Sequence, residues 1–158
     1  MASRKIEDLI SGLQAKYRLF EAKMKEVGIP FIVTCTARTV KEQVALYAQG
    51  RESLEHVNIL RKQAGLGPIR MQENVRKVTW TLNSKHIIDL DDGNPDNDKS
   101  RAFDIVILND QFQPTWDIKA NVNKNEIPDY KEAGKVGESI GLTWGGRWKK
   151  PDYPHFQI

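Results

Sequence analysis

The chain has 158 residues, and its 24 Lys and Arg against 21 Asp and Glu give a net charge of +3. This length fits one domain with a sizeable core, so we expect residues 1–158 to form a single domain that includes an N-terminal helix within 1–28. No apolar run approaches the ~20 residues that span a bilayer, which predicts no insertion into membranes. The charge is too small to indicate nucleic-acid binding, and the single cysteine, Cys35, excludes an intrachain disulfide and a four-cysteine zinc site.

The first part of the chain predicts three helices and one strand. Apolar residues recur at three- and four-residue steps over residues 3–27, as in an amphipathic helix, and Gly28 can end it. Residues 30–36 are apolar and β-branched, which favours a buried strand. A Thr-x-x-Glu capping box opens a second helix over residues 39–49, and a third is expected over 53–64.

The remainder mixes loops, strands and one helix. Residues 75–81 alternate and predict a strand, and residues 102–108 form a nearly continuous apolar strand. We expect loops at 65–74 and 89–99, the second of them acidic, a helix at 128–140 and a short strand at 155–157. Helices mixed with few strands indicate an α+β fold.

Asp104 interrupts the apolar run of residues 102–108. A carboxylate placed toward a core costs several kcal/mol unless a cation compensates it. The structural interpretation is an ion pair with an arginine such as Arg38 or Arg101. The functional interpretation is a metal ligand held on a rigid strand.

Two of the three histidines lie beside carboxylates in the sequence, whereas His56 lies in a predicted surface helix. His155 follows Asp152 by three positions in a segment stiffened by two prolines. Together with His86, His155 and one aspartate would make a three-ligand zinc site with an open position, which is the catalytic type. A carboxylate beside it could take a proton from water, and Arg38 is a candidate for stabilising an oxyanion.

Three separated motifs of the chain match one known family. Residues 83–86 (Asn-Ser-Lys-His) and 100–104 (Ser-Arg-Ala-Phe-Asp) resemble the Ser-x-His-x-x-Gly-x-Ala-x-Asp motif of the zinc D-Ala-D-Ala and L-Ala-D-Glu peptidases. Residues 37–51 resemble its Arg-Thr-x-x-Glu-Gln-x-x-Leu-Tyr segment, and residues 141–157 resemble the C-terminus of its phage endolysins.

The resemblance implies zinc ligands at His86, Asp104 and His155, with Asp152 as the catalytic base and Arg38 in contact with the scissile carbonyl. It also implies the small antiparallel sheet flanked by helices that the D,D-carboxypeptidases share with the Hedgehog domain. The residues that we expect to contact substrate are Ser84, Gln43, Trp144 and Trp148. For the two tryptophans, packing in the core is an equal alternative.

The spacing of the first motif departs from the family. Asp104 follows His86 by 18 positions where the motif has seven, and Ser100 stands where the motif has glycine. The inserted residues are the acidic loop, and its aspartates are alternative ligands: Asp89, Asp91 and Asp92. We favour Asp104 because a strand fixes metal geometry better than a loop does.

Calcium is an alternative in two loops. The acidic loop could gather a hard cation, but its spacing does not fit an EF-hand. Asn121, Asn123 and Asn125 have the EF-hand spacing with Glu132 eleven positions beyond the first, but Glu126 replaces the required glycine. We favour a solvated polar loop in both places.

The resemblance implies a zinc peptidase that cuts the stem peptides of bacterial peptidoglycan at the L-Ala-D-Glu bond. We expect a monomeric phage endolysin, made in the host cytoplasm without a signal peptide and acting at the cell wall. The nearest alternative is a D,D-carboxypeptidase that removes terminal D-Ala. A non-catalytic, zinc-containing wall-binding module is the alternative of another class.

Overall fold

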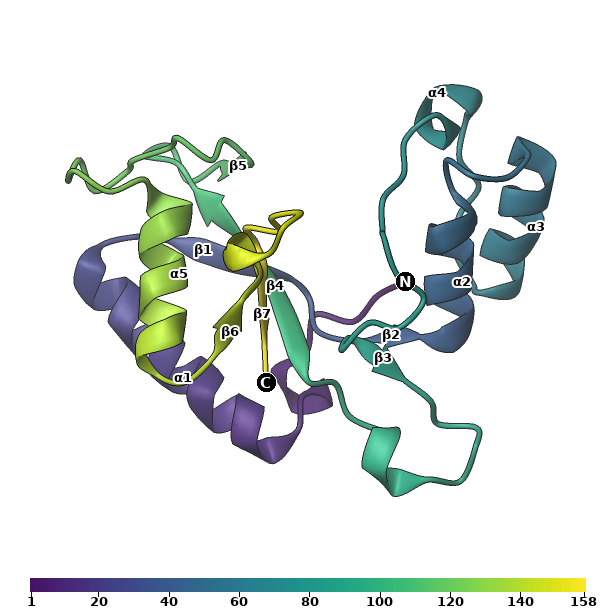
Figure 1. The fold of residues 1–158 in the computed structure, drawn as a ribbon, viewed down its shortest axis with the longest axis horizontal. Coiled ribbons are helices and arrows are strands. Elements are labelled where there is room, and N and C mark those ends of the chain that lie inside the picture. Colours follow the sequence, from purple (N-terminus) through teal and green to yellow (C-terminus); the bar gives the residue numbers. More distant parts are fainter.

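A computed structural model describes all 158 residues, and the elements form two groups (Figure 1). One group is an antiparallel sheet covered by α1 and α5, and the other is formed by α2, α3 and α4, with β2 and β3 between the two groups. The helices are η1 (Ile6–Asp8), α1 (Ser11–Val27), α2 (Val40–Ala48), α3 (Leu54–Gln63), α4 (Met71–Asn74), η2 (Pro95–Asn97), α5 (Asp129–Ser139) and η3 (Gly145–Arg147). The strands are β1 (Phe31–Cys35), β2 (Arg38–Thr39), β3 (Ile87–Ile88), β4 (Ala102–Leu108), β5 (Pro114–Thr115), β6 (Thr143–Trp144) and β7 (His155–Gln157).

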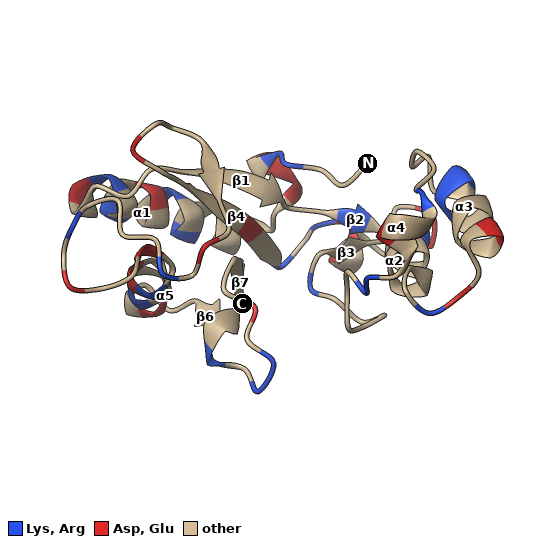
Figure 2. Ribbon diagram, turned by 90° about the horizontal axis from the view of Figure 1, so that it is seen from above, with Lys and Arg blue, Asp and Glu red and all other residues tan.

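The main sheet has the strand order β1-β4-β7-β6, and β5 pairs with the far end of β4. All of its pairings are antiparallel, with β4 in the centre. In Figure 2, β4 carries a red segment, and Asp104 is its one acidic residue. The register sets Asp104 opposite Cys35 on one side and His155 on the other. The sheet therefore places an acid and an imidazole side by side.

The core lies between the sheet and the two helices that cover it. Its centre is a group of aromatic rings, with Phe103 stacked on Phe156 at 5.4 Å between ring centroids and Phe20 tilted against Phe156 at 4.9 Å. On α5, Gly137 lies so close to the Phe156 ring that a methyl group there would overlap it. This close packing holds β7 against α5 and fixes the strand that carries His155.

The second group has its own small core of Ala48, Val57 and Ile69. The capping box predicted at the start of α2 is present, since Thr39 Oγ1 accepts from Glu42 N and Glu42 Oε2 accepts from Thr39 N. None of the helices is both long enough and apolar enough to cross a membrane.

Most predicted elements are confirmed, including the strands at β1, β4 and β7 and the helices at α2, α3 and α5. The small antiparallel sheet flanked by helices is also present, so the predicted α+β fold class is confirmed. The acidic loop is confirmed as a loop with one short 3-10 turn, η2. The predicted loop at 65–74 contains the one-turn helix α4, which the sequence analysis did not predict.

Two predictions are wrong. The first helix begins at Ser11 instead of Ser3. The backbone before it bonds to other parts of the chain, since Ser3 N donates to Ala37 O and Ile10 N donates to Ser100 O. The alternating residues 75–81 find no partner strand and form an exposed connection, in which the Trp80 side chain is 61% exposed. Alternation alone does not make a strand where no strand edge is available for pairing.

Candidate functional site

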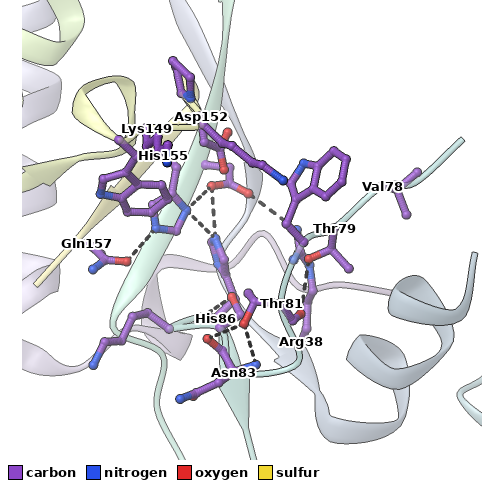
Figure 3. A pocket seen from close by; sticks show the side chains of 17 residues that line it. Arg38, Val78, Thr79, Thr81, Asn83, His86, Lys149, Asp152, His155 and Gln157 are labelled. Atoms are coloured by element: carbon purple, nitrogen blue, oxygen red, sulfur yellow. Dashed lines mark hydrogen bonds and ion pairs between the residues drawn. The ribbon is translucent and has the colours of Figure 1, made fainter. Parts of the chain in front are cut away.

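Two imidazoles and one carboxylate converge at the floor of a pocket between the two groups of elements (Figure 3). Asp104 Oδ1 lies 3.0 Å from His86 Nε2 and 2.9 Å from His155 Nδ1. The two imidazole nitrogens are 3.2 Å apart. Three donor atoms distant in sequence thus form one compact triangle.

The local fold explains this convergence. Asp104 and His155 are direct partners in the β4–β7 ladder. His86 immediately precedes β3, which pairs with β2 in parallel, and Arg38 N donates to His86 O at 2.8 Å. The short β2–β3 pair therefore brings His86 and Arg38 to the edge of the main sheet.

Each imidazole is held by a second contact on its other nitrogen. His86 Nδ1 lies 3.0 Å from Thr36 O, and His155 Nε2 lies 2.9 Å from Gln157 Oε1. Because these partners accept hydrogen bonds, Nδ1 of His86 and Nε2 of His155 carry the protons of the neutral rings. In the neutral rings, His86 Nε2 and His155 Nδ1 therefore carry the lone pairs that a metal ion could bind. This outer shell is the arrangement that orients metal-binding histidines.

The triangle fits a zinc ion. Donors at about 2.0–2.2 Å from a tetrahedral zinc lie about 3.3–3.6 Å from one another. The three atoms here are 2.9–3.2 Å apart, so a small outward movement would admit the ion. Two imidazoles and one carboxylate leave a fourth position toward the pocket, as in catalytic zinc sites. His86, Asp104 and His155 are therefore the residues that could hold a metal.

The electrostatics of the cluster also favour a bound cation. Burial acts to lower the pKa of His86, but its hydrogen bonds to Asp104 and Cys35 outweigh burial and raise it to about 10. Burial acts to raise the pKa of Asp104, but hydrogen bonds from His155 and His86 hold it well below its usual range. Positive charge beside this carboxylate is thus strongly favoured, from a proton on His86 or from a metal ion.

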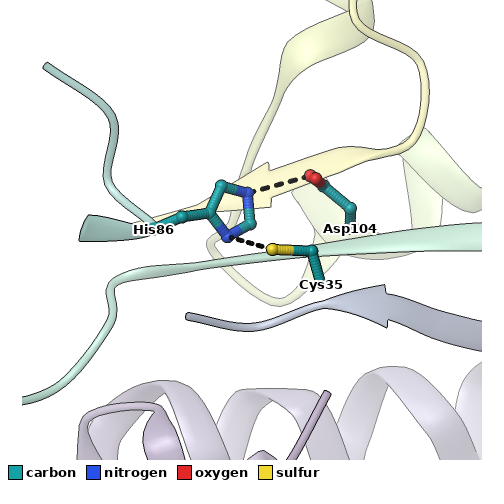
Figure 4. A group of neighbouring side chains, drawn as sticks. All are labelled: Cys35, His86 and Asp104. Atoms are coloured by element: carbon teal, nitrogen blue, oxygen red, sulfur yellow. Dashed lines mark hydrogen bonds and ion pairs between the residues drawn. The ribbon is translucent and has the colours of Figure 1, made fainter. Parts of the chain in front are cut away.

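Cys35 lies near the cluster but faces the wrong side of the imidazole (Figure 4). Its side chain, with those of His86 and Asp104, presents possible ligand atoms within 4.8 Å of one another. However, Cys35 Sγ contacts His86 Nδ1 at 3.6 Å, whereas Asp104 contacts Nε2. One ion cannot bind both ring nitrogens, so Cys35 and Asp104 cannot share an ion through His86. Cys35 is a small buried residue with a free thiol.

Arg38 and Asp152 flank the triangle on the pocket walls (Figure 3). Arg38 Nη2 lies 3.5 Å from Asp104 Oδ2, so the ion pair considered from the sequence is present. Asp152 lies in the turn before β7, where its carbonyl accepts from His155 N at 3.2 Å. The loss of hydration in the pocket and the charge of Asp104 both raise the pKa of Asp152 above its ordinary value.

The four residues predicted to contact substrate fall into two classes. Ser84 and Trp148 line the pocket. Trp144 is 3% exposed, and its indole Nε1 donates to Tyr153 O, so it belongs to the core. Gln43 is 1% exposed and donates to Thr81 O at 2.7 Å, so it holds the pocket wall in place without lining it.

The alternative ligands in the acidic loop do not approach the two imidazoles. Asp89 Oδ1 accepts from Asp91 N, and the two carboxylate oxygens of Asp92 accept from Asn94 N and Asn97 Nδ2. The carboxylates of these aspartates therefore accept hydrogen bonds within their own loop, and Asp104 is the carboxylate beside the imidazoles. His56 also lies elsewhere, on the surface helix α3 beside Glu52.

The pocket has a volume of about 690 Å³ and contains residues that the sequence analysis missed. One wall is the segment after α4, with Thr79 and Trp80, and the other carries Lys149 and Lys150. Lys150 Nζ lies 4.3 Å from the centre of the Trp80 ring, so the two walls meet across the pocket. The sequence signal that could have indicated this wall was Trp80, a tryptophan between polar residues.

Comparisons with known proteins find similarity to peptidases. Residues 98–158, which include Asp104, Asp152 and His155, match the family model described as D-alanyl-D-alanine carboxypeptidase. The chain is 25% identical over 132 residues to the peptidoglycan L-alanyl-D-glutamate endopeptidase CwlK of Bacillus subtilis. The chain is thus similar in sequence to peptidases that cut D-Ala-D-Ala or L-Ala-D-Glu bonds. The aligned part covers 83% of this chain and 62% of the Bacillus protein, which is longer.

A solved structure supports the fold of this chain. The L-Ala D-Glu endopeptidase ChiX of Serratia marcescens superposes with a TM-score of 0.55 at 18% sequence identity. The superposition covers 100% of this chain and 88% of the Serratia chain. The Hedgehog/D,D-peptidase type of fold, expected from the sequence resemblance, is confirmed.

Proposed function

We propose that this chain is a zinc-dependent peptidase that hydrolyses the L-Ala-D-Glu bond in the stem peptides of peptidoglycan. The observation that carries the proposal is the triangle of His86 Nε2, Asp104 Oδ1 and His155 Nδ1 at the floor of an open pocket. The name of the Bacillus relative supports the choice of bond.

In this proposal His86, Asp104 and His155 hold one zinc ion. When bound, the ion supplies Lewis acidity, which brings the pKa of water to ~7 and polarises a carbonyl. Asp152 takes the proton of the attacking water and passes it to the leaving amine. Its raised pKa suits both steps, because a group must be basic enough to accept the proton and acidic enough to return it.

Arg38 has two roles in this account. Its contact with Asp104 Oδ2 at 3.5 Å leaves Oδ1 of that carboxylate free to face the imidazoles. Its guanidinium also lines the pocket, where it stabilises the oxyanion that develops on the scissile carbonyl. Gln43 Oε1 accepts from Arg38 Nη1 at 3.4 Å and helps to hold this geometry.

The pocket suits an anionic peptide of several residues. Lys85, Lys149 and Lys150 line it together with Trp80 and Trp148, so carboxylates and apolar surfaces both find partners. A volume of about 690 Å³ lies in the range of sites that bury a drug-sized ligand, which exceeds the needs of a terminal D-Ala alone. An internal cut in the stem peptide therefore fits better than a terminal one.

We further propose that the chain acts as a phage endolysin, a monomer made in the host cytoplasm and active at the cell wall. The support for the phage role is the resemblance of residues 141–157 to the C-terminus of phage endolysins. Purification of the chain followed by lysis assays on whole walls tests this role separately from the bond that is cut.

Muropeptide analysis by mass spectrometry tests the function. We expect a new N-terminal D-Glu after digestion and no product after treatment with a zinc chelator. Release of free D-Ala would instead identify a D,D-carboxypeptidase, which is the description of the matching family model. Binding of walls without any cleavage would identify a non-catalytic wall-binding module.

A further inference from the structure

The segment 121–132, which links β5 to α5 and includes the first turn of α5, has the composition of a cation-binding loop. A twelve-residue calcium loop places oxygen ligands at positions 1, 3, 5, 7, 9 and 12, the seventh through a backbone carbonyl. The corresponding residues of the 121–132 segment are Asn121, Asn123, Asn125, Ile127, Asp129 and Glu132. Each position of the pattern that needs a side-chain ligand is therefore occupied by a residue with a side-chain oxygen.

The hydrogen bonds of the 121–132 segment fold it around these side chains. Asn123 Nδ2 and Asn125 Nδ2 donate to Glu132 Oε2 at 3.0 and 2.7 Å, which brings the last position of the pattern against the loop. Asn125 Oδ1 accepts from Ile127 N at 2.8 Å, and Asn121 Oδ1 accepts from Asn125 N at 3.2 Å. The side chains at positions 1, 3, 5 and 12 of the pattern are thus linked by hydrogen bonds within the segment.

Asp129 provides an independent observation. It is 0% exposed, and its Oδ2 accepts from Val122 N at 2.8 Å, so the carboxylate is directed into the loop. Its Oδ1 is buried and has no hydrogen-bond partner. Burial and the charge of Glu132 raise the pKa of Asp129. Neither acid forms an ion pair, so two carboxylates meet here with no cation to compensate them.

The buried carboxylate of Asp129 does not fit the solvated loop that the sequence favoured. We propose that the 121–132 segment binds one calcium ion, with Asp129 and Glu132 as its charged ligands and the three asparagines and the Ile127 carbonyl as neutral ones. Glu126 stands where such loops have glycine, and the positive φ of 56° lies at Lys124 instead. Two charged ligands place the affinity in the weak class of extracellular calcium modules, with Kd on the order of 10⁻⁴–10⁻³ M.

The ion would stabilise the scaffold of the peptidase site from outside the pocket. The proposed calcium site includes the first turn of α5. Gly137 of the same helix packs against Phe156, which lies beside His155 on β7. The proposal does not rest on the proposed function, because it concerns the folding of α5 and is tested by stability.

Thermal unfolding of the full chain tests the site. The protein is dialysed against resin-treated, calcium-free buffer, its zinc content is measured, and CaCl₂ is added to 10 mM. For a Kd of ~1 mM we expect Tm to rise by about 3–5 °C. Addition of 10 mM MgCl₂, or of NaCl at equal ionic strength, should raise it by less than about 1 °C.

Two variants form a matched pair. Glu132→Gln removes a proposed ligand and should abolish the calcium-dependent rise, whereas Glu126→Gln makes the same charge change outside the ligand set and should retain it. Calorimetric titration of the wild type with CaCl₂ should show one site per chain, which supports the proposal even if Glu132→Gln fails to fold. No rise in Tm and no binding heat, an equal rise with magnesium, or an undiminished rise in Glu132→Gln would overturn it.

Discussion

Replacement of Asp152, the proposed catalytic base, by asparagine should separate catalysis from metal binding. The substitution keeps the size of the side chain, and the turn is held by backbone bonds, from Asp152 N to Gly145 O at 2.9 Å and from His155 N to Asp152 O at 3.2 Å. Because no side-chain hydrogen bond is lost and Asp152 is not in the ligand triangle, we expect folding and zinc content to be retained. Loss of a general base lowers kcat by about 10²–10⁴, which is about 3–5 kcal/mol of barrier.

The assay is steady-state cleavage of purified muropeptides, with zinc measured in the same sample. Asp91→Asn, in the acidic loop, is the matched control and should leave kcat unchanged. Since the pKa of Asp152 is raised, the acid limb of the wild-type kcat profile should lie above the ordinary pKa of an aspartate, at ~3.9, and should vanish in the variant. A kcat within threefold of wild type would refute the assignment of Asp152 as the base.

Three further outcomes follow from the geometry. Gln157→Leu removes the acceptor that orients one imidazole, so zinc affinity measured by chelator competition should fall about 10–100-fold; unchanged affinity would contradict this. Because the pKa of His86 is about 10, zinc must displace a proton below that pH, so affinity should rise about tenfold per pH unit from 7 to 9; a flat profile would show that this imidazole is already neutral. Gly137→Ala forces a methyl group into the Phe156 ring and should cost about 1–3 kcal/mol in calorimetric unfolding, whereas Gly12→Ala, with open space around it, should not destabilise; equal effects would contradict the packing.

The sequence was most informative where one physical rule acts locally. β4 follows from an apolar run, and Asp104 stands out because a carboxylate inside such a run needs a positive partner. The capping box of α2 fixes where that helix begins. The pairing of Asp104 with His155 follows only once β4 and β7 are placed side by side, and no local pattern specifies that register.

Prediction failed where distant segments decide the structure. The first ten residues carry a helical apolar spacing, but their backbone bonds to Ala37 and Ser100 outweigh it. Residues 75–81 have the alternation of a strand, and become instead the pocket wall that carries Trp80. Whether a tryptophan faces a pocket or the core depends on tertiary packing, which is why Trp148 and Trp144 differ.

The most direct test of the account is a crystal structure of the zinc-loaded protein with diffraction recorded at the zinc absorption edge. We predict one strong anomalous peak within about 2.0–2.2 Å of His86 Nε2, Asp104 Oδ1 and His155 Nδ1, with Cys35 outside the coordination sphere. No peak at that triangle, or a peak coordinated by Cys35 in place of His155, would contradict it.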